Sequence, residues 1–523
     1  MRRDRRRGIC PIMGVVNGVF GISQIYAFCG GQKGVCPAGC PHGGPARWAG
    51  RAYIRGMSTF ALVNPYTGET EQEFTRIKDS ERDAILDRST AAYKQWRTTS
   101  IEERAAVLAK AADIYEEKLD ELADIIGREM GKHVRWAKGE VKIVVDIYRW
   151  YAEHAHELMQ DEFLASHGAF KTFIRKDPIG PLLGIMPWNF PYYQVARWAA
   201  PNLLLGNSLI LKHASLCPLS SQACQDILEQ AGLPKDVFIN VYASGSQMDA
   251  FVADKRIAGV SLTGSEKAGA AVAKTAGEHY KKSLLELGGN DPFIILDDKN
   301  LDWVLEQFVK IRMYNAGQAC NAPKRLIVMS SFYDRVVDKL TELISAMTVG
   351  AHDDPNVDMG PMSSIEACDE LVERLQDAAD KGHATIRVGG KKIGSAAAME
   401  PTLLTDVDPT SDVGCNEIFG PVAVVYQVKD AQEAIELANN TDYGLGSSVW
   451  GTDIEQATEV ANQLEAGMTF VNEASVTAAF LPFGGIGRSG YGRELARWGV
   501  GEFVNEHLYR ISDQKDAGLS PVI

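Results

Sequence analysis

A chain of 523 residues is long enough for more than one domain and for large hydrophobic cores. Hydrophobic residues make up 45% of it and charged residues 23%, the proportions of an ordinary globular protein. The net charge of -14 argues against a general nucleic-acid binder, because neutralising phosphates requires a surplus of Lys and Arg. Beyond Met57 no apolar run is long enough to span a bilayer, so no membrane segment is expected.

The first 56 residues differ from the rest of the chain. They carry eight Arg, one Lys, one Asp and four of the nine cysteines. Three interpretations are open: a signal peptide, a metal site and an extension ahead of a start at Met57. A basic stretch at 2–7 followed by an apolar run at 9–22 favours the first, whereas the Cys and His spacings fit no zinc pattern. We favour an unstructured extension over 1–56 and expect no metal.

Five cysteines are scattered over the remainder: Cys217, Cys224, Cys320, Cys368 and Cys415. An odd and scattered set in a large acidic chain is typical of reduced thiols. We therefore expect a cytoplasmic protein.

A long helix is predicted early in the chain. Ser100-Ile101-Glu102-Glu103 is a capping box, in which the Ser and Glu side chains satisfy free backbone N–H groups at a helix start. Apolar residues recur at near-helical spacing over 107–126. The helix should end at Gly127 or Gly131.

Short apolar runs separated by helical stretches follow from residue 182. The first series predicts buried parallel strands at Leu182–Met186, Ser208–Lys212, Val237–Tyr242 and Gly259–Thr263. The second series predicts strands at Phe293–Leu296, Leu326–Met329, Val422–Val428 and Thr469–Asn472. This alternation indicates an α/β fold with two domains, and a functional site at the junction between them.

The segment from Leu284 to Cys320 contains the best candidates for catalysis. Glu286 stands among leucines, and a carboxylate with apolar neighbours tends to have a raised pKa, which suits a general base. Cys320 follows a polar turn that contains glycine, where backbone N–H groups can favour a reactive thiolate. A single Glu or Cys of this kind is usually a buried structural residue.

The two candidates stand in motifs that resemble the aldehyde dehydrogenase superfamily. These are Leu285-Glu286-Leu287-Gly288-Gly289 and Asn315-Ala316-Gly317-Gln318-Ala319-Cys320. Three further motifs occur in the same order as in that family: Pro187-Trp188-Asn189-Phe190-Pro191, Glu417-Ile418-Phe419-Gly420-Pro421 and Pro482-Phe483-Gly484-Gly485. The resemblance runs from about Asn64 to about Asn505.

The resemblance implies a chemistry for three of these residues. Cys320 attacks an aldehyde to give a thiohemiacetal, and hydride transfer to a nicotinamide leaves a thioester. The Asn189 amide and the Cys320 N–H hold the oxyanion. Glu286 activates the water that hydrolyses the thioester.

The resemblance also implies a domain plan. A dinucleotide-binding domain is expected over 57–160 and 179–287, and a catalytic domain over 288–487. A β-arm and tail over 161–178 and 488–523 should serve oligomerisation, as a homodimer or a homotetramer.

The cofactor implied is NADP or NAD, although no Gly-x-Gly-x-x-Gly follows a predicted strand. Gly264 and Ser265 end a strand and lead into a helical run at 266–276, a favourable place for a pyrophosphate. Lys212 should bond the adenosine ribose. Ser215 occupies the place of a glutamate that repels a 2′-phosphate in NAD-preferring relatives, so NADP should be accepted. Four more cofactor contacts are implied: Trp188, Leu287, Glu417 and Phe419.

The substrate is indicated by Arg197, six residues after Pro191. Succinate-semialdehyde dehydrogenases carry an arginine there that binds the distal carboxylate. Their second arginine is replaced here by Tyr314, and Arg312 is out of register. The motifs are most similar to those of bacterial NAD(P)-dependent succinate-semialdehyde dehydrogenases. Three alternatives remain open: a broad aliphatic specificity, a non-catalytic protein of the same fold, and a purely salt-bridged Arg197.

Overall fold

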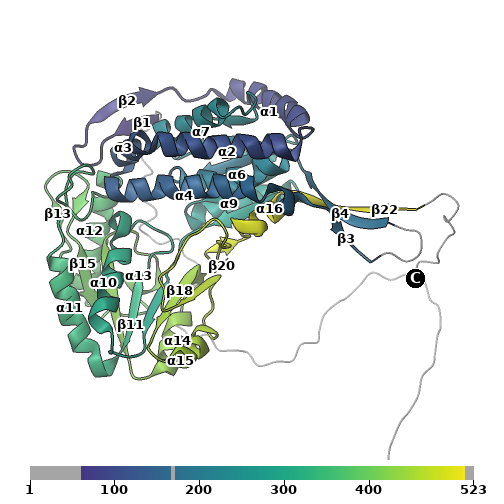
Figure 1. Cartoon of the computed structure of the whole chain (residues 1–523). Helices are drawn as coiled ribbons and strands as arrows, with labels where there is room; N and C mark the ends of the chain where they lie inside the picture. The colour runs from purple at the N-terminus through teal and green to yellow at the C-terminus, as the bar shows by residue number, and fades with distance from the viewer. Residues whose placement is uncertain (1–59, 166–170, 513–523) are drawn as a thin grey trace, which may run out of the picture. The chain divides into compact units, whose positions relative to one another are not determined.

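The computed structural model describes residues 60–165 and 171–512 (Figure 1). The predicted extension over 1–56 lies outside the described residues. The architecture is the α/β fold expected from the sequence, with two separate, mainly parallel sheets.

The first sheet has six strands in the order β21-β9-β8-β5-β6-β7. The strands are β5 (Pro181–Met186), β6 (Ser208–His213), β7 (Phe238–Asn240), β8 (Gly259–Thr263), β9 (Lys282–Glu286) and β21 (Gly490–Tyr491). All neighbours are parallel except β21, which pairs antiparallel with β9. The chain starts at β5, builds outward through β6 and β7, and then returns to the other side of β5 with β8. Such a reversal makes a topological switch point, where α/β sheets bind ligands.

Both faces of the first sheet are buried. In β6, Leu209 and Leu211 lie in one hydrophobic core while Ile210 lies in another, because successive side chains point to opposite faces. The core at Leu209 is covered by α2 (Ile101–Glu117), α3 (Leu119–Met130), α4 (Val134–Glu153), α6 (Tyr193–Leu205) and α7 (Pro218–Gln230). The opposite core is covered by the start of α1 (Arg82–Trp96), α8 (Gly245–Ala253) and α9 (Glu266–Glu278).

The second sheet has seven strands in the order β12-β15-β16-β11-β10-β18-β19. They are β10 (Pro292–Ile295), β11 (Arg325–Met329), β12 (Thr385–Val388), β15 (Thr402–Thr405), β16 (Val422–Val428), β18 (Gly446–Trp450) and β19 (Met468–Val471), and only β12 runs antiparallel. One hydrophobic core joins this sheet to its helices. These helices are α10 (Leu301–Arg312), α11 (Tyr333–Ser345), α12 (Ile365–Asp380), α14 (Ala431–Asn439) and α15 (Ile454–Ala461).

A three-stranded antiparallel sheet extends away from the helices (Figure 1). It consists of β3 (Glu162–Phe163), β4 (Lys171–Pro178) and β22 (Val504–Ile511). Phe173 of β4 stacks on Tyr509 of β22, with 4.9 Å between the ring centroids. The predicted β-arm therefore has a structural counterpart, while its role in oligomerisation stays a prediction.

Short elements complete the described chain. They are β1 (Phe60–Val63), β2 (Thr70–Phe74), α5 (Ala155–Met159), β13 (Lys392–Ile393), β14 (Ala398–Met399), α13 (Asp412–Cys415), β17 (Tyr443–Gly444), β20 (Ile486–Gly487) and α16 (Ala496–Glu502). Residues 488–502, which the sequence assigned to the tail, include β21 in the first sheet and α16 against α6. Of the tail residues that the structure describes, 488–512, only β22 joins the arm sheet.

The single long helix expected after Ser100 is two helices. The capping box is present, with the Glu103 N–H donating to Ser100 Oγ at 3.1 Å. Lys118 leaves the helical conformation between α2 and α3, and Gly131 ends α3 in the left-handed conformation. The periodicity of the apolar residues continues across this break, because both helices bury the same side against α4.

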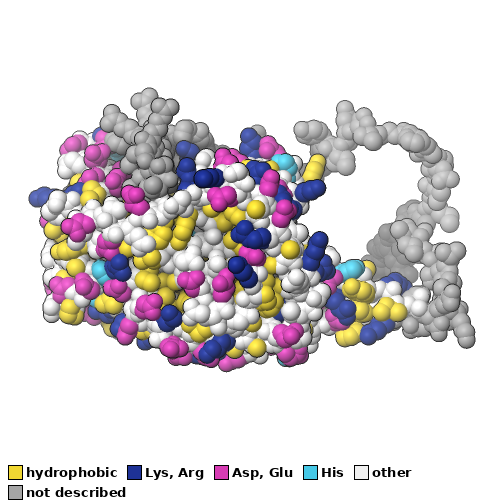
Figure 2. Space-filling model, turned by 90° about the horizontal axis from the view of Figure 1, so that it is seen from above, with side chains coloured by type: hydrophobic (Ala, Val, Ile, Leu, Met, Phe, Trp, Pro, Cys, Tyr) yellow, Lys and Arg dark blue, Asp and Glu magenta, His cyan; other side chains and the backbone are white. Residues whose placement is uncertain are grey.

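Acidic and basic side chains are interspersed over the face of the molecule shown in Figure 2. In the described part of the chain, no helix is both long enough and apolar enough to cross a membrane.

Candidate active site

The site is built where the carboxyl ends of the first sheet meet the loops that enter the second sheet. β5 leads into Trp188 and Asn189, β8 into Gly264, and β9 ends at Glu286. The backbone of Gly289 closely approaches the carbonyl of Cys320: a Cβ on Gly289 would lie 2.5 Å from that oxygen. A Cβ on Gly288 would lie 2.5 Å from Glu417 Oε2. The two glycines therefore allow three chain segments to converge.

The nucleophile loop begins with a strained turn. Asn315, Ala316 and Gly317 all have positive φ, at 53°, 53° and 68°. Arg312 holds this turn, since its guanidinium donates to the carbonyls of Gly317 at 3.1 Å and Gly420 at 2.8 Å. Left-handed residues other than glycine are costly and are retained where the surroundings enforce them. Arg312 is thus committed to backbone carbonyls and is not placed to meet a substrate.

Cys320 follows this turn and remains partly exposed. Its N–H makes no hydrogen bond within the described residues, so it is free to receive an oxyanion. Burial raises the pKa of the thiol to about 12, although the charges of Arg197 and Lys324 lower it. Burial therefore opposes ionisation of the thiol and the two cations favour it, and the reactive thiolate expected from the sequence stays a prediction.

Glu286 is fully buried, as its leucine neighbours suggest, and lies among charged residues. Neither carboxylate oxygen makes a hydrogen bond of good geometry. Burial raises the pKa of Glu286 to about 8, while Arg197 lowers it and Glu494 raises it. A carboxyl group with such a pKa can act as a proton acceptor near neutrality.

Arg197 lies between two buried carboxyl groups. Its Nε forms a short ion pair with Glu494, and its Nη2 lies 4.0 Å from Glu286 Oε2. It also donates to the hydroxyls of Tyr193 at 3.3 Å and Thr263 at 3.2 Å. The side chain has no exposed surface, so the structure brings Arg197 to the general-base candidate and not to an open surface. Glu494 was missed from the sequence, where it follows Arg493 and gives no pattern of its own.

Asn189 is fixed by both of its polar groups. Its Nδ2 donates to the Gln318 carbonyl at 3.1 Å, and its Oδ1 accepts from Gln194 Nε2 at 3.0 Å. The second N–H of the amide is left for a ligand. The structure therefore brings Asn189 to the nucleophile loop, two residues before Cys320.

The backbone of Asn189 is held by a buried ion pair that the sequence analysis missed. Lys132 donates to the Asn189 carbonyl at 2.8 Å and makes a short ion pair with Glu140. Glu140 accepts from the N–H groups of Tyr192 and Tyr193 at 2.9 and 3.2 Å, at the start of α6. In the sequence, Lys132 stands out only because it follows Gly131, at the end of a predicted helix.

The adenosine side of the cofactor region contains an unpaired cation. Lys212 is the penultimate residue of β6, and burial lowers its pKa to about 8. Within the described residues its ammonium group has no hydrogen-bond or ion-pair partner. A buried cation without a partner fits an acceptor that a ligand supplies. Ser215 is exposed two residues beyond the strand.

The phosphate candidate lies at the start of α9. Ser265 is the N-cap residue, and its hydroxyl accepts from the Ala268 N–H at 3.4 Å. The remaining N–H groups and dipole of this helix favour an anion. A Cβ on Gly264 would meet Leu262 at 3.8 Å, an ordinary van der Waals contact, so close packing does not explain this glycine.

The nicotinamide candidates come from both sheets. Trp188 and Phe419 meet edge to face, with 5.7 Å between their ring centroids. Glu417 pairs with Lys324 at 2.9 Å and is 16% exposed. Leu287 is buried against Gly269 of α9, at the hydrophobic core on one face of the first sheet. It can therefore contact a cofactor only at the edge of that core.

Comparison with known proteins agrees with this geometry. The model of the aldehyde dehydrogenase family matches residues 53–508. The chain belongs to the aldehyde dehydrogenase family. It is an NAD(P)-dependent enzyme that oxidises aldehydes, and the fold and resemblance expected from the sequence are confirmed.

Individual aldehyde dehydrogenases are similar over most of their length. A protein of Deinococcus radiodurans named succinate-semialdehyde dehydrogenase (NADP+) is 43% identical over 460 residues, which are 88% of this chain and 96% of that protein. The crystal structure of succinic semialdehyde dehydrogenase from Streptococcus pyogenes with NADP+ is 39% identical, with a TM-score of 0.84, and the match covers 87% of this chain and 100% of that chain. A betaine aldehyde dehydrogenase from Staphylococcus aureus with NAD+ is 29% identical, with a TM-score of 0.84, covering 87% and 94% of the two chains.

Replacing Glu286 by Gln should stabilise the fold in a pH-dependent way. A carboxyl group with a raised pKa holds its proton more tightly in the folded protein, so folding is penalised once the unfolded chain ionises, above about pH 4. The penalty grows up to about pH 8, the pKa of Glu286 in the folded protein. Denaturant unfolding should therefore show equal stability at pH 4 and a gain of up to about 5 kcal/mol for Glu286→Gln at pH 8.

The matched control is Glu342→Gln, because Glu342 is exposed and pairs only with Lys339. This control should follow the wild type at every pH. If the unfolding curves of Glu286→Gln matched those of the wild type at both pH values, burial would not raise the pKa of the Glu286 carboxyl group.

Proposed function

We propose that the enzyme oxidises succinate semialdehyde to succinate with NADP or NAD, through a thiohemiacetal and a thioester on Cys320. The observation that carries the chemistry is the convergence of Cys320, Glu286 and Asn189 on one buried site. The substrate assignment is supported by the printed names of the relatives and by the positive charge of Arg197 beside the nucleophile.

In the first half of the reaction, Cys320 adds to the aldehyde carbon. Positive charge from Arg197 and Lys324 favours the thiolate, while burial makes an ionised sulfur strongly nucleophilic. The free N–H of Asn189 Nδ2 and the Cys320 N–H receive the negative oxygen of the thiohemiacetal. When bound, the nicotinamide supplies the hydride acceptor.

Residues of this chain would hold that cofactor from both sheets. Lys212 and Ser215 would meet the adenosine ribose, and the start of α9 with Gly264 and Ser265 would meet the pyrophosphate. Trp188, Leu287, Glu417 and Phe419 would surround the nicotinamide half.

In the second half, Glu286 removes a proton from water. The resulting hydroxide attacks the thioester carbonyl, the Cys320 thiolate leaves, and a carboxylic acid is released. Arg197 and Glu494 set the proton affinity of Glu286, since one lowers and the other raises its pKa. Arg197 would act on the substrate through Tyr193. Its guanidinium donates to the Tyr193 hydroxyl, and the Tyr193 ring packs edge to face on Phe483.

Matched aldehydes test the substrate assignment on the wild-type enzyme. Succinate semialdehyde should exceed butanal in kcat/KM by roughly a hundredfold, because the Tyr193 hydroxyl that Arg197 contacts can donate a charge-assisted hydrogen bond, worth about 2–3 kcal/mol, to the distal carboxylate. Steady-state reduction of NADP measures both. Equal values for succinate semialdehyde, butanal and hexanal would instead establish the broad aliphatic specificity.

Arg197→Met should lower turnover of all three aldehydes, because it leaves Glu286 and Glu494 without a compensating charge. The wild-type comparison is for that reason the decisive one. A loss confined to succinate semialdehyde would contradict the role of Arg197 beside the base.

Ser215→Glu should shift the cofactor preference towards NAD. The new carboxylate would repel a 2′-phosphate, so KM for NADP should rise at least tenfold while KM for NAD stays within about twofold. Ser215→Ala is the control, because it removes the hydroxyl without adding charge. If the Glu variant kept the wild-type KM for NADP, Ser215 would not lie at the ribose.

A further inference from the structure

Lys324 is a buried cation beside the nucleophile that the proposed reaction does not yet explain. Its side chain is only 1% exposed. The ammonium group donates to the Ala319 carbonyl at 2.8 Å and, through a shorter bond, to the Cys320 carbonyl. Its third contact is Glu417 Oε1 at 2.9 Å. All three N–H groups of Lys324 are therefore directed at the site.

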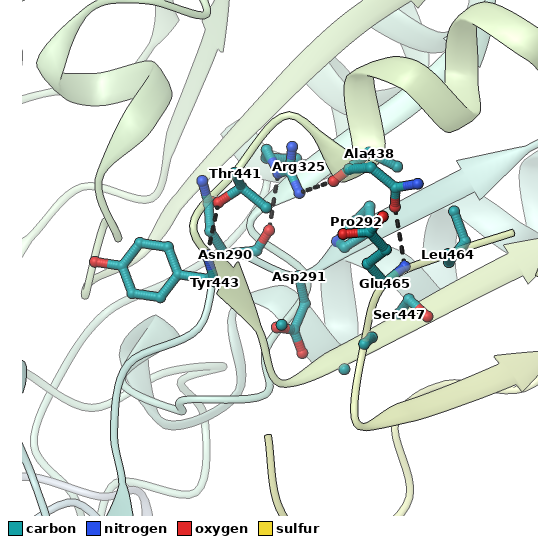
Figure 3. A pocket seen from close by; sticks show the side chains of 14 residues that line it. Asn290, Asp291, Pro292, Arg325, Ala438, Thr441, Tyr443, Ser447, Leu464 and Glu465 are labelled. Atoms are coloured by element: carbon teal, nitrogen blue, oxygen red, sulfur yellow. Dashed lines mark hydrogen bonds between the residues drawn. The ribbon is translucent and has the colours of Figure 1, made fainter. Parts of the chain in front are cut away.

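The backbone that carries Lys324 is itself rigidly held. The N–H groups of Lys324 and Arg325 donate to the Asp291 carbonyl at 3.0 and 3.2 Å. Figure 3 shows the Arg325 guanidinium among backbone carbonyls, and it donates to those of Asn290 at 2.8 Å and Ala438 at 2.7 Å. These residues also line a pocket, and Cys320 is not among its lining residues.

Glu417 connects Lys324 to a second segment of the site. The Gly289 N–H donates to Glu417 Oε1 at 3.3 Å, the same oxygen that accepts from Lys324. One carboxylate therefore ties the turn after Glu286 to the loop of Cys320. Because Glu417 keeps some exposure, it can also meet a ligand from the cleft.

We propose that Lys324 is a positioning residue that, together with Glu417, fixes the Cys320 loop and keeps a positive charge beside the thiol. This inference rests on the proposed function of Cys320 as the nucleophile. It assigns Glu417 a second role, because a carboxylate expected at the nicotinamide ribose also opposes the charge of Lys324.

Four charged groups act on the thiol, each from a different segment. Arg197 of α6 and Lys324 before β11 lower the thiol pKa, whereas Glu286 at the end of β9 and Glu417 after α13 raise it. Removing the charge of Lys324 or of Glu417 should therefore shift thiol ionisation in opposite directions. A residue that only held the loop in place would not produce opposite shifts.

The test measures alkylation of the cofactor-free, full-length enzyme by iodoacetamide between pH 6 and pH 10. Lys324→Met should slow the reaction of Cys320 roughly tenfold at each pH, and Glu417→Gln should accelerate it by a similar factor, for a unit charge a few ångströms away at a partly shielded site. Peptide mass spectrometry identifies the modified cysteine. Lys339→Met, an exposed lysine of α11, should leave the rate unchanged.

Rates that change in the same direction in both variants would overturn the inference, since loosening of the loop alone predicts faster alkylation in each. Unchanged rates would overturn it as well. Should Lys324→Met fail to fold, Lys324→Gln replaces it, because this variant also removes the charge and must slow the alkylation if the proposal holds. A lack of modification at Cys320 itself would overturn the proposed function.

Discussion

The ion pair between Arg197 and Glu494 lies at the centre of this enzyme, because it determines how much charge the site can bury. In the proposed reaction Glu286 and Cys320 lose protons in a place where burial opposes the ionisation of both. Removing one partner of a buried pair typically costs 3–5 kcal/mol, so neither residue can be changed alone at small cost. The same arginine lowers the pKa of the base and of the nucleophile. Both reactive groups are therefore tuned by one side chain.

The fold makes this concentration of charge possible by bringing strand ends and rigid loops together. The first sheet contributes Glu286 at the end of β9 and Asn189 after β5, and the second contributes the loop before β11. Glycines at 288 and 289 let the segments approach, and Arg312 and Lys324 bind the carbonyls that would otherwise be left unsatisfied. Where the backbone is irregular, these cationic side chains thus donate the hydrogen bonds that a helix or a sheet would otherwise supply to the carbonyl groups.

Several of these features could be predicted from the sequence, and others could not. Apolar runs predicted β5, β6, β8 and β16 well, because buried parallel strands are continuous in hydrophobicity. β9 and β18 were missed, since Lys282 and the small residues of Gly446–Trp450 weaken that signal. The motifs led to Cys320 and Glu286, but Glu494, Lys132 and Lys324 give no local pattern, because their partners are distant in the chain or are backbone carbonyls. Arg197 shows the limit most clearly: its place six residues after Pro191 marked it as a candidate, but only the structure shows Glu494 beside it.

The most direct test of the central claim is a single-turnover experiment on Glu286→Gln with NADP and succinate semialdehyde. With attack intact and hydrolysis blocked, each active subunit should reduce one NADP in a burst. Mass spectrometry after acid quench should then find a succinyl group on the peptide that contains Cys320. Continued turnover without a covalent adduct, or an adduct on another residue, would contradict the assignment of nucleophile and base.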